Sequence, residues 1–345
     1  MSEGLRTAVS EGVRRFVSPR KAAAQAVGFL LGALLVFWVV KGALATAGDE
    51  SRAGILESVR TAWETRPMLV VGLAVTTAAS LVIDGALFWL VLLPVRRLGF
   101  MEMQWVTFVA AMSNFFPVRL GLAVRYAYAL KANRMTFLEA TAWFAAVTLV
   151  ILVSLGAVVL ATMAFPKPGV GWVLVAVAAI AVGGLALVRA VRLGPVARRL
   201  GEWARMVTTP GTYWTGTLIR VAEVFLWIVR MWCAAEILRL DLDFAKVTIL
   251  GVAAIAVMLN PLGRLGFREA TTVIVANWMA GGGLDVAHAD AGFKQLALVE
   301  SLGEMFTTIP MGIVALPFLA AWFRRRLREA PGAPAAPTAP ADARS

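Results

Sequence analysis

The sequence lacks the residues from which many enzyme active sites are built. Its 345 residues include one cysteine, Cys233, and one histidine, His288. A single cysteine forms no internal disulfide, and a single histidine cannot build a multi-histidine zinc site or a histidine relay. No Gly-x-x-x-x-Gly-Lys-Ser/Thr stretch for binding nucleotide phosphates occurs either. We therefore expect a protein that is not an enzyme and that uses no metal and no cofactor.

Charged residues are also scarce. They make up 16% of the chain, whereas hydrophobic residues make up 60%. A soluble domain typically has about 25% charged and about 45–50% apolar residues. The apolar residues form long runs with at most one charge each, at 22–40, 68–93, 141–165 and 171–188. Because about 18 such residues suffice to cross about 30 Å of hydrocarbon, the runs predict an all-α polytopic membrane protein.

The pattern predicts about six transmembrane helices, at 22–46, 68–94, 137–165, 170–190, 213–238 and 292–323. Two more apolar segments, 103–116 and 244–259, are too short to span comfortably. Each stops at an Asn and a Pro and is followed by a second short segment. Two re-entrant hairpins of broken helices fit this pattern, because non-helical backbone at membrane depth occurs where protein or a water-filled cavity surrounds it.

The net charge of +12 is spread along the ends of the apolar runs. Lysine and arginine in these places orient helices and meet anionic headgroups, so we expect no nucleic-acid partner. Most of them fall on one side when the N-terminus and the C-terminus are both placed in the cytoplasm. Residues 1–21 show apolar residues at helical spacing with arginines between them, which is typical of an amphipathic helix on the cytoplasmic surface.

The two halves of the chain follow the same order of elements. Arg119-Leu120-Gly121 and Arg264-Leu265-Gly266 lie 145 residues apart, and each half reads span, span, broken hairpin, span. The first half starts from inside and the second from outside, which predicts an inverted-topology repeat. We expect the first repeat at 22–165, the second at 166–325, and a disordered Pro/Ala-rich tail at 326–345.

Polar residues gather at the two breaks. The first group is Asn114, Pro117, Arg119, Gly121 and Arg125, and the second is Asn260, Pro261, Gly263, Arg264, Gly266, Arg268 and Glu269. A helix that restarts after a proline exposes free N–H groups and partial positive charge, which with arginines suits an anion such as a lipid phosphate. The alternative is equally open: the arginines snorkel to the interface or pair with acidic residues.

Acidic residues inside the spans are candidates for proton or ion coupling. They are Asp84, Glu223, Glu300 and Glu304. Arg220 and Arg230 share a helix face with Glu223, because spacings of three and seven bring residues to the same side. The alternative role for all of them is structural pairing between helices.

At the two breaks the sequence resembles the lysylphosphatidylglycerol synthase transmembrane-region family of flippase-like membrane proteins. The residues that carry the resemblance are those from Asn114 to Gly121, then Arg125, and those from Asn260 to Glu269. Leu122 stands where the first family motif has Glu, and Arg264 replaces the second Gly of the second motif. The resemblance implies a bacterial inner-membrane protein that handles an anionic phospholipid or a polyprenyl-phosphate lipid, here without the soluble transferase domain.

The sequence therefore favours a lipid transporter or flippase-like protein that binds an anionic headgroup near mid-membrane. Two alternatives remain. One is a membrane scaffold or partner subunit with structural broken helices. The other is a membrane enzyme that modifies lipid headgroups, with Glu269, Glu300 or Glu304 as general acid or base.

Overall fold

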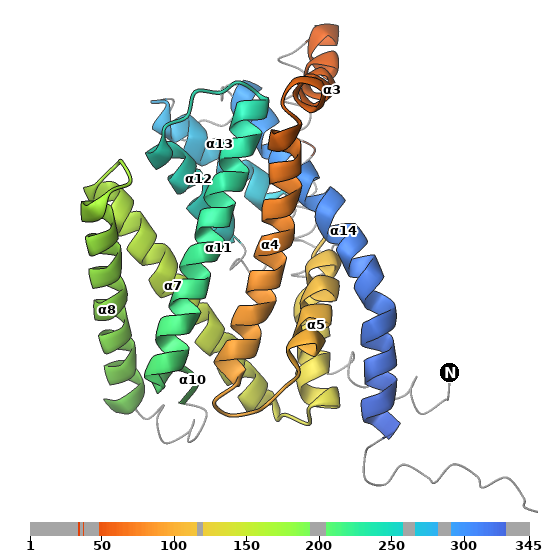
Figure 1. Cartoon of the computed structure of the whole chain (residues 1–345), viewed down its shortest axis with the longest axis vertical. Helices are drawn as coiled ribbons and strands as arrows, with labels where there is room; N and C mark the ends of the chain where they lie inside the picture. The colour runs from red at the N-terminus through yellow and green to blue at the C-terminus, as the bar shows by residue number, and fades with distance from the viewer. Residues whose placement is uncertain are drawn as a thin grey trace, which may run out of the picture.

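The computed structural model shows a bundle of helices (Figure 1). It describes residues 34, 37, 48–115, 120–193, 205–257, 266–281 and 291–328. Within these residues every regular element is helical and none is a strand, so the expected all-α class is confirmed. The predicted amphipathic segment 1–21, nearly all of the predicted first span, and the tail beyond 328 lie outside the described residues.

Four described helices are long and apolar enough to cross a membrane. They are α4 (Pro67–Leu92), α7 (Phe137–Ala164), α8 (Val170–Leu193) and α14 (Ala291–Arg328), and they coincide with the predicted spans 68–94, 137–165, 170–190 and 292–323. Their outward side chains are apolar: Met163 is 73% exposed and Phe306 is 79% exposed. Apolar surface of this extent is typical of helices that face lipid.

Helix α11 (Pro210–Ile237) occupies the centre of the bundle and corresponds to the predicted span 213–238. It is 28 residues long, but Arg220, Glu223 and Arg230 make it less apolar than α4, α7 and α8. It packs along α4 and also contacts α7, α12 and α14. Because neighbouring helices surround it, α11 buries its charged residues inside protein instead of exposing them to lipid.

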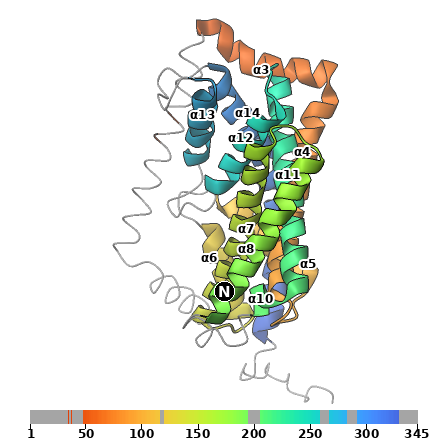
Figure 2. The same ribbon diagram turned by 90° about the vertical axis from the view of Figure 1, so that its left-hand side faces the viewer.

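The ends of the long helices follow from local sequence. Helices α4 and α11 both begin with proline, whose missing N–H and fixed φ suit the first helical position. Helix α7 begins with a capping box: the Thr136 side chain accepts the Glu139 N–H at 3.3 Å, and the Glu139 carboxylate accepts the Thr136 N–H at 2.7 Å. Two further helices are the four-residue α10 (Arg205–Thr208) and α3 (Gly48–Thr65). Helix α3 lies across one end of the bundle (Figure 2).

The two short apolar segments form helix pairs, as the sequence predicts. Helix α5 (Phe100–Ser113) packs on α6 (Leu120–Ala127), which continues as the π-helix η1 (Tyr128–Ala132), and α12 (Phe244–Val257) packs on α13 (Phe267–Met279). The breaks themselves, 116–119 and 258–265, lie outside the described residues. Both views place α12 and α13 near the end that carries α3, and α5 and α6 towards the other end (Figures 1 and 2).

Gly121 lets α5 and α6 approach closely. A Cβ at this position would lie 2.2 Å from the Ala110 carbonyl oxygen and 2.3 Å from Asn114 Oδ1, both far inside van der Waals contact. We expect Gly121→Ala to lower the free energy of unfolding by about 1–3 kcal/mol, because the two helices must separate. Thermal unfolding in detergent measures the effect.

Gly156→Ala is the matched control. Gly156 also lies within a helix, and a Cβ there meets no atom within 4 Å. We expect it to leave stability unchanged or to raise it by up to about 1 kcal/mol. Equal melting temperatures for the two variants would contradict the close packing of α5 on α6.

Candidate functional site

The structure describes about half of the residues predicted to bind an anion. Asn114, Gly121, Arg125, Gly266, Arg268 and Glu269 are described. The other six lie outside the described residues: Pro117, Arg119, Asn260, Pro261, Gly263 and Arg264. The four predicted coupling residues, Asp84, Glu223, Glu300 and Glu304, are all described.

At the first break, Arg125 pairs with Asp84. The Arg125 Nη2 of α6 lies 2.6 Å from the Asp84 Oδ2 of α4, and both side chains are mostly buried. The guanidinium also stacks on the Phe88 ring, 3.7 Å from its centroid. Asn114 ends α5 and packs against Gly121. The first break thus brings a predicted anion-binding arginine to a predicted coupling acid, and this pair ties α6 to α4.

At the second break, Glu269 fixes the start of α13. Gly266 has φ of 83°, a left-handed conformation that glycine adopts without strain, and its N–H donates to Glu269 Oε2 at 2.7 Å. The hydroxyl of Ser301 on α14 donates to the other carboxylate oxygen of Glu269. Glu269 therefore caps α13 and connects its first turn to α14, which is a structural role that its position in the motif did not reveal.

Four buried side chains form the most concentrated group of charges, which we call the Arg–Glu cluster: Arg230, Arg268, Glu300 and Glu304. Arg230 Nη2 lies 2.5 Å from Glu300 Oε1 and 3.5 Å from Glu304 Oε2. Arg268 forms ion pairs with both glutamates as well. Each carboxylate is thus shared between two guanidinium groups, and none of the four side chains is more than 3% exposed.

Aromatic and hydroxyl groups complete the surroundings of the cluster. The Arg230 guanidinium lies 3.5 Å from the centroid of the Trp227 ring, and its Nη1 donates to Thr77 Oγ1 of α4 at 3.4 Å. Arg268 donates to the Ser301 hydroxyl at 2.7 Å. The cluster therefore joins α11, α13 and α14 and reaches α4. Thr77, Trp227 and Ser301 were not predicted as site residues, because common uncharged residues within apolar spans give no signal of their own.

A second buried pair continues the polar interior. Arg220 pairs with Glu223 one turn along α11. Glu223 also accepts a hydrogen bond from the Ser80 hydroxyl of α4 at 3.2 Å, and Ser80 in turn accepts the Trp227 indole N–H at 3.1 Å. Spacings of three and four place Thr77, Ser80 and Asp84 on one face of α4. Polar contacts thus follow the α4–α11 interface from the Asp84 pair to the Arg–Glu cluster.

The arrangement limits the chemistry of this interior. Isolated charges in a medium of low dielectric are strongly disfavoured, so every guanidinium here needs a carboxylate or another anion. The described residues contain no group of three or more His, Cys, Asp and Glu side chains suited to a metal ion. An anionic ligand at Arg125 or Arg268 would therefore compete with a carboxylate that is already bound.

A scan against protein-family models, a search of curated proteins and a search of solved structures each found no match to this chain.

The contribution of the Arg–Glu cluster to the stability of the protein can be tested by a single substitution. Arg268→Met removes one guanidinium and leaves two buried carboxylates with Arg230 as their shared cation. We expect the free energy of unfolding to fall by about 3–5 kcal/mol, the usual cost of leaving a buried ion unpaired. Chemical denaturation in detergent, followed by tryptophan fluorescence, measures it.

Arg60→Met is the matched control for this substitution. Arg60 pairs with Glu64 at 2.9 Å, but its side chain is 80% exposed, and exposed pairs contribute about 0–1 kcal/mol. A loss below about 1 kcal/mol for both variants would show that the cluster does not hold the helices together.

Proposed function

We propose that this chain is a lipid transporter of the flippase type in a bacterial inner membrane. It binds an anionic phospholipid or polyprenyl-phosphate headgroup at arginines beside its two helix breaks. The single observation that carries the proposal is the Arg–Glu cluster beside the first turn of α13. Ionisable residues inside membrane-spanning bundles are costly and usually mark a substrate or ion pathway.

An inverted repeat of two halves supports transport by alternating access. Pro67 and Pro210, 143 residues apart, each begin a long helix, and Phe100 and Phe244, 144 residues apart, each begin a short one. Under the proposal both helix pairs are re-entrant hairpins. The placement of the pairs towards opposite ends (Figures 1 and 2) agrees with halves that enter from opposite sides. Rocking about the α4–α11 interface would then open each end in turn.

Ion-pair exchange is the binding step that the contacts favour. A headgroup phosphate takes the place of the Glu304 or Glu300 carboxylate at Arg268, since both carry negative charge and accept from guanidinium N–H groups. Arg230 keeps the other glutamate in place. Arg230 is then left to balance two buried carboxylates, so the displaced one takes up a proton. Under this proposal lipid binding and proton binding occur together, and Asp84 plays the same part at Arg125.

A second candidate function is a membrane scaffold or partner subunit. One observation favours it: Arg125, Arg230 and Arg268 all have carboxylate partners without any ligand. In that case the broken helices and their ion pairs serve the fold alone, and removing arginines near the breaks has no effect on bound lipid.

Native mass spectrometry of the gently purified protein distinguishes the two functions. The test variant is the double substitution Arg119→Ala and Arg264→Ala, which removes one arginine from each break and leaves the described ion pairs intact. We expect the wild type to retain an anionic lipid and the variant to lose it, because the headgroup loses two of its cationic contacts.

The control is the double substitution Arg60→Ala and Arg324→Ala. Both residues are exposed on helices, so the net charge changes equally while the breaks stay intact. Lipid retained by the control and lost by the test variant supports the transporter. Equal retention in all three proteins would overturn it in favour of the scaffold.

A further inference from the structure

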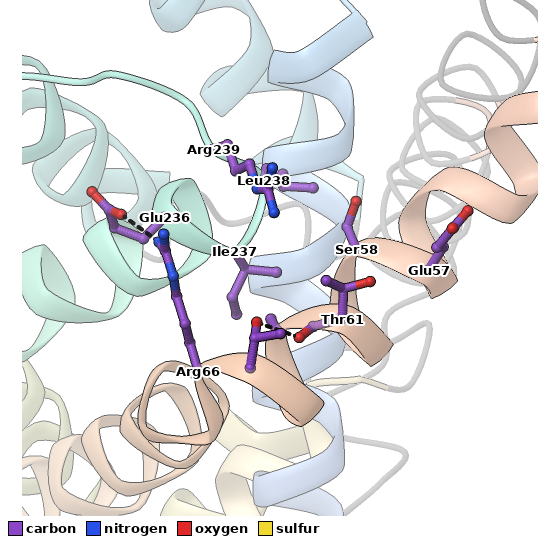
Figure 3. Close-up of a pocket in the computed structure, with 10 residues that line it drawn as sticks. Glu57, Ser58, Thr61, Arg66, Glu236, Ile237, Leu238 and Arg239 are labelled. Atoms are coloured by element: carbon purple, nitrogen blue, oxygen red, sulfur yellow. Dashed lines mark hydrogen bonds and ion pairs between the residues drawn. The ribbon is translucent and has the colours of Figure 1, made fainter.

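A separate pocket lies at the end of the bundle where α3 crosses (Figure 3). Its volume is about 300 Å³. The lining comes from α3 with the turn after it and from the last turn of α11: Glu57, Ser58, Thr61, Ala62, Thr65, Arg66, Glu236, Ile237, Leu238 and Arg239. None of these residues belongs to the Arg–Glu cluster or to the predicted breaks. Two arginines, two glutamates and three hydroxyl side chains therefore line one small space.

The charges of this pocket are available to a ligand. Arg66 Nη1 lies 3.6 Å from Glu236 Oε2, and the two side chains are 57% and 37% exposed. Figure 3 shows Arg66 reaching from the corner between α3 and α4 to Glu236 on α11. This contact is longer and more hydrated than the pairs of the Arg–Glu cluster, so a ligand separates it at little cost.

Helix ends add partial charges of both signs. Arg66 is the N-cap residue of α4, and its side chain makes no capping hydrogen bond. The positive end of the α4 dipole and the negative end of α3, which ends at Thr65, therefore meet at Arg66. Glu236 lies in the last turn of α11, at the negative end of that helix dipole. The guanidinium groups are thus the anion-binding side of the pocket, and Glu236 at the end of α11 is its cation-binding side.

Arg239 stands at a position that normally requires glycine. Its φ is 55°, and its N–H donates to the Glu236 carbonyl while the Leu240 N–H donates to the Ala235 carbonyl. These two bonds form the usual glycine-containing end of a helix. An arginine there strains the backbone, and strained backbone is concentrated at functional sites. Arg239 supplies a second guanidinium at the pocket, beside that of Arg66.

We infer that this pocket binds a zwitterionic headgroup that carries a phosphate and an ammonium group, as in phosphatidylethanolamine. The phosphate binds Arg66 and Arg239, and the ammonium binds Glu236, which lies beside Arg66. The volume is at the lower end of the about 300–1,000 Å³ typical of ligand pockets, which suits a headgroup and not its chains. The inference does not depend on transport, because no pocket residue takes part in the proposed ion-pair exchange.

The test is the thermal shift of the full-length protein in a non-ionic detergent with three soluble probes. They are dihexanoyl-phosphatidylethanolamine, free O-phosphoethanolamine and dihexanoyl-phosphatidylglycerol. The variants are Arg66→Ala and Glu236→Ala, with Arg60→Ala as the control, because Arg60 lies on the same helix but does not line the pocket. We expect the ethanolamine lipid to raise the melting temperature of the wild type and of the control, and to raise it far less in both pocket variants.

A similar rise in melting temperature with O-phosphoethanolamine also supports the site and identifies a free zwitterion as a ligand. A rise with the ethanolamine lipid but not with O-phosphoethanolamine identifies a membrane lipid as the ligand. An equal rise with phosphatidylglycerol would overturn the zwitterion assignment. No rise in the wild type, or the same rise in the pocket variants, would overturn the site. None of these three outcomes affects the Arg119/Arg264 experiment. Failure of the pocket inference is therefore distinguishable from failure of the proposed transport function.

Discussion

A guanidinium buried among apolar helices must have an anionic partner, and the interior of this bundle is organised around that requirement. Arg230 and Arg268 share Glu300 and Glu304, so no one of the four can move without affecting the other three. The sharing brings α11, α13 and α14 together, and Thr77 extends the contacts to α4. Burying such a network costs desolvation energy, and separating one of its ion pairs costs more because it leaves a buried charge unpaired. The four side chains therefore have few alternative arrangements.

The same constraint limits how an anionic lipid can bind. The described arginines at the breaks are not free charges, since Arg125 has Asp84 and Arg268 has two glutamates. In the proposed function a headgroup exchanges with a carboxylate, and the exchange changes contacts between helices. The sequence suggests the arginines as binding groups and the acids as separate coupling groups. In the proposed exchange both take part in the same step. In this proposal binding is connected to movement, because the arginines that would bind the lipid also pair α13 with α14 and α6 with α4.

The sequence was informative wherever a local pattern determines structure. Uninterrupted apolar runs predicted α4, α7 and α8, the predicted span 292–323 coincides with α14 in spite of its charges, and the two Asn/Pro breaks predicted the pairs α5–α6 and α12–α13. The predicted span 213–238 lies where the structure has α11, and its residues Arg220, Glu223 and Arg230 are buried. The spacing of Glu300 and Glu304 gave a single polar stripe on α14.

The sequence did not predict which arginine pairs with which glutamate. Arg268 is separated from Glu300 by 32 residues and Arg230 from Glu304 by 74, and periodicity along one helix does not say which other helix it faces. The capping role of Glu269 depends on the left-handed backbone of Gly266, and the pocket between α3 and α11 depends on where α3 crosses the bundle. Each of these is a property of tertiary packing.

The exchange of a phosphate for a carboxylate at Arg268 is tested most directly by counting protons. Isothermal titration of the wild type with dihexanoyl-phosphatidylglycerol, in two buffers of different ionisation enthalpy, gives the number of protons taken up for each lipid bound. We expect about one, since Arg230 alone does not balance two buried carboxylates, and a smaller number in a variant with Glu300→Gln and Glu304→Gln, which keeps Asp84 alone as a proton acceptor. Lipid binding to the wild type without proton uptake would contradict the account.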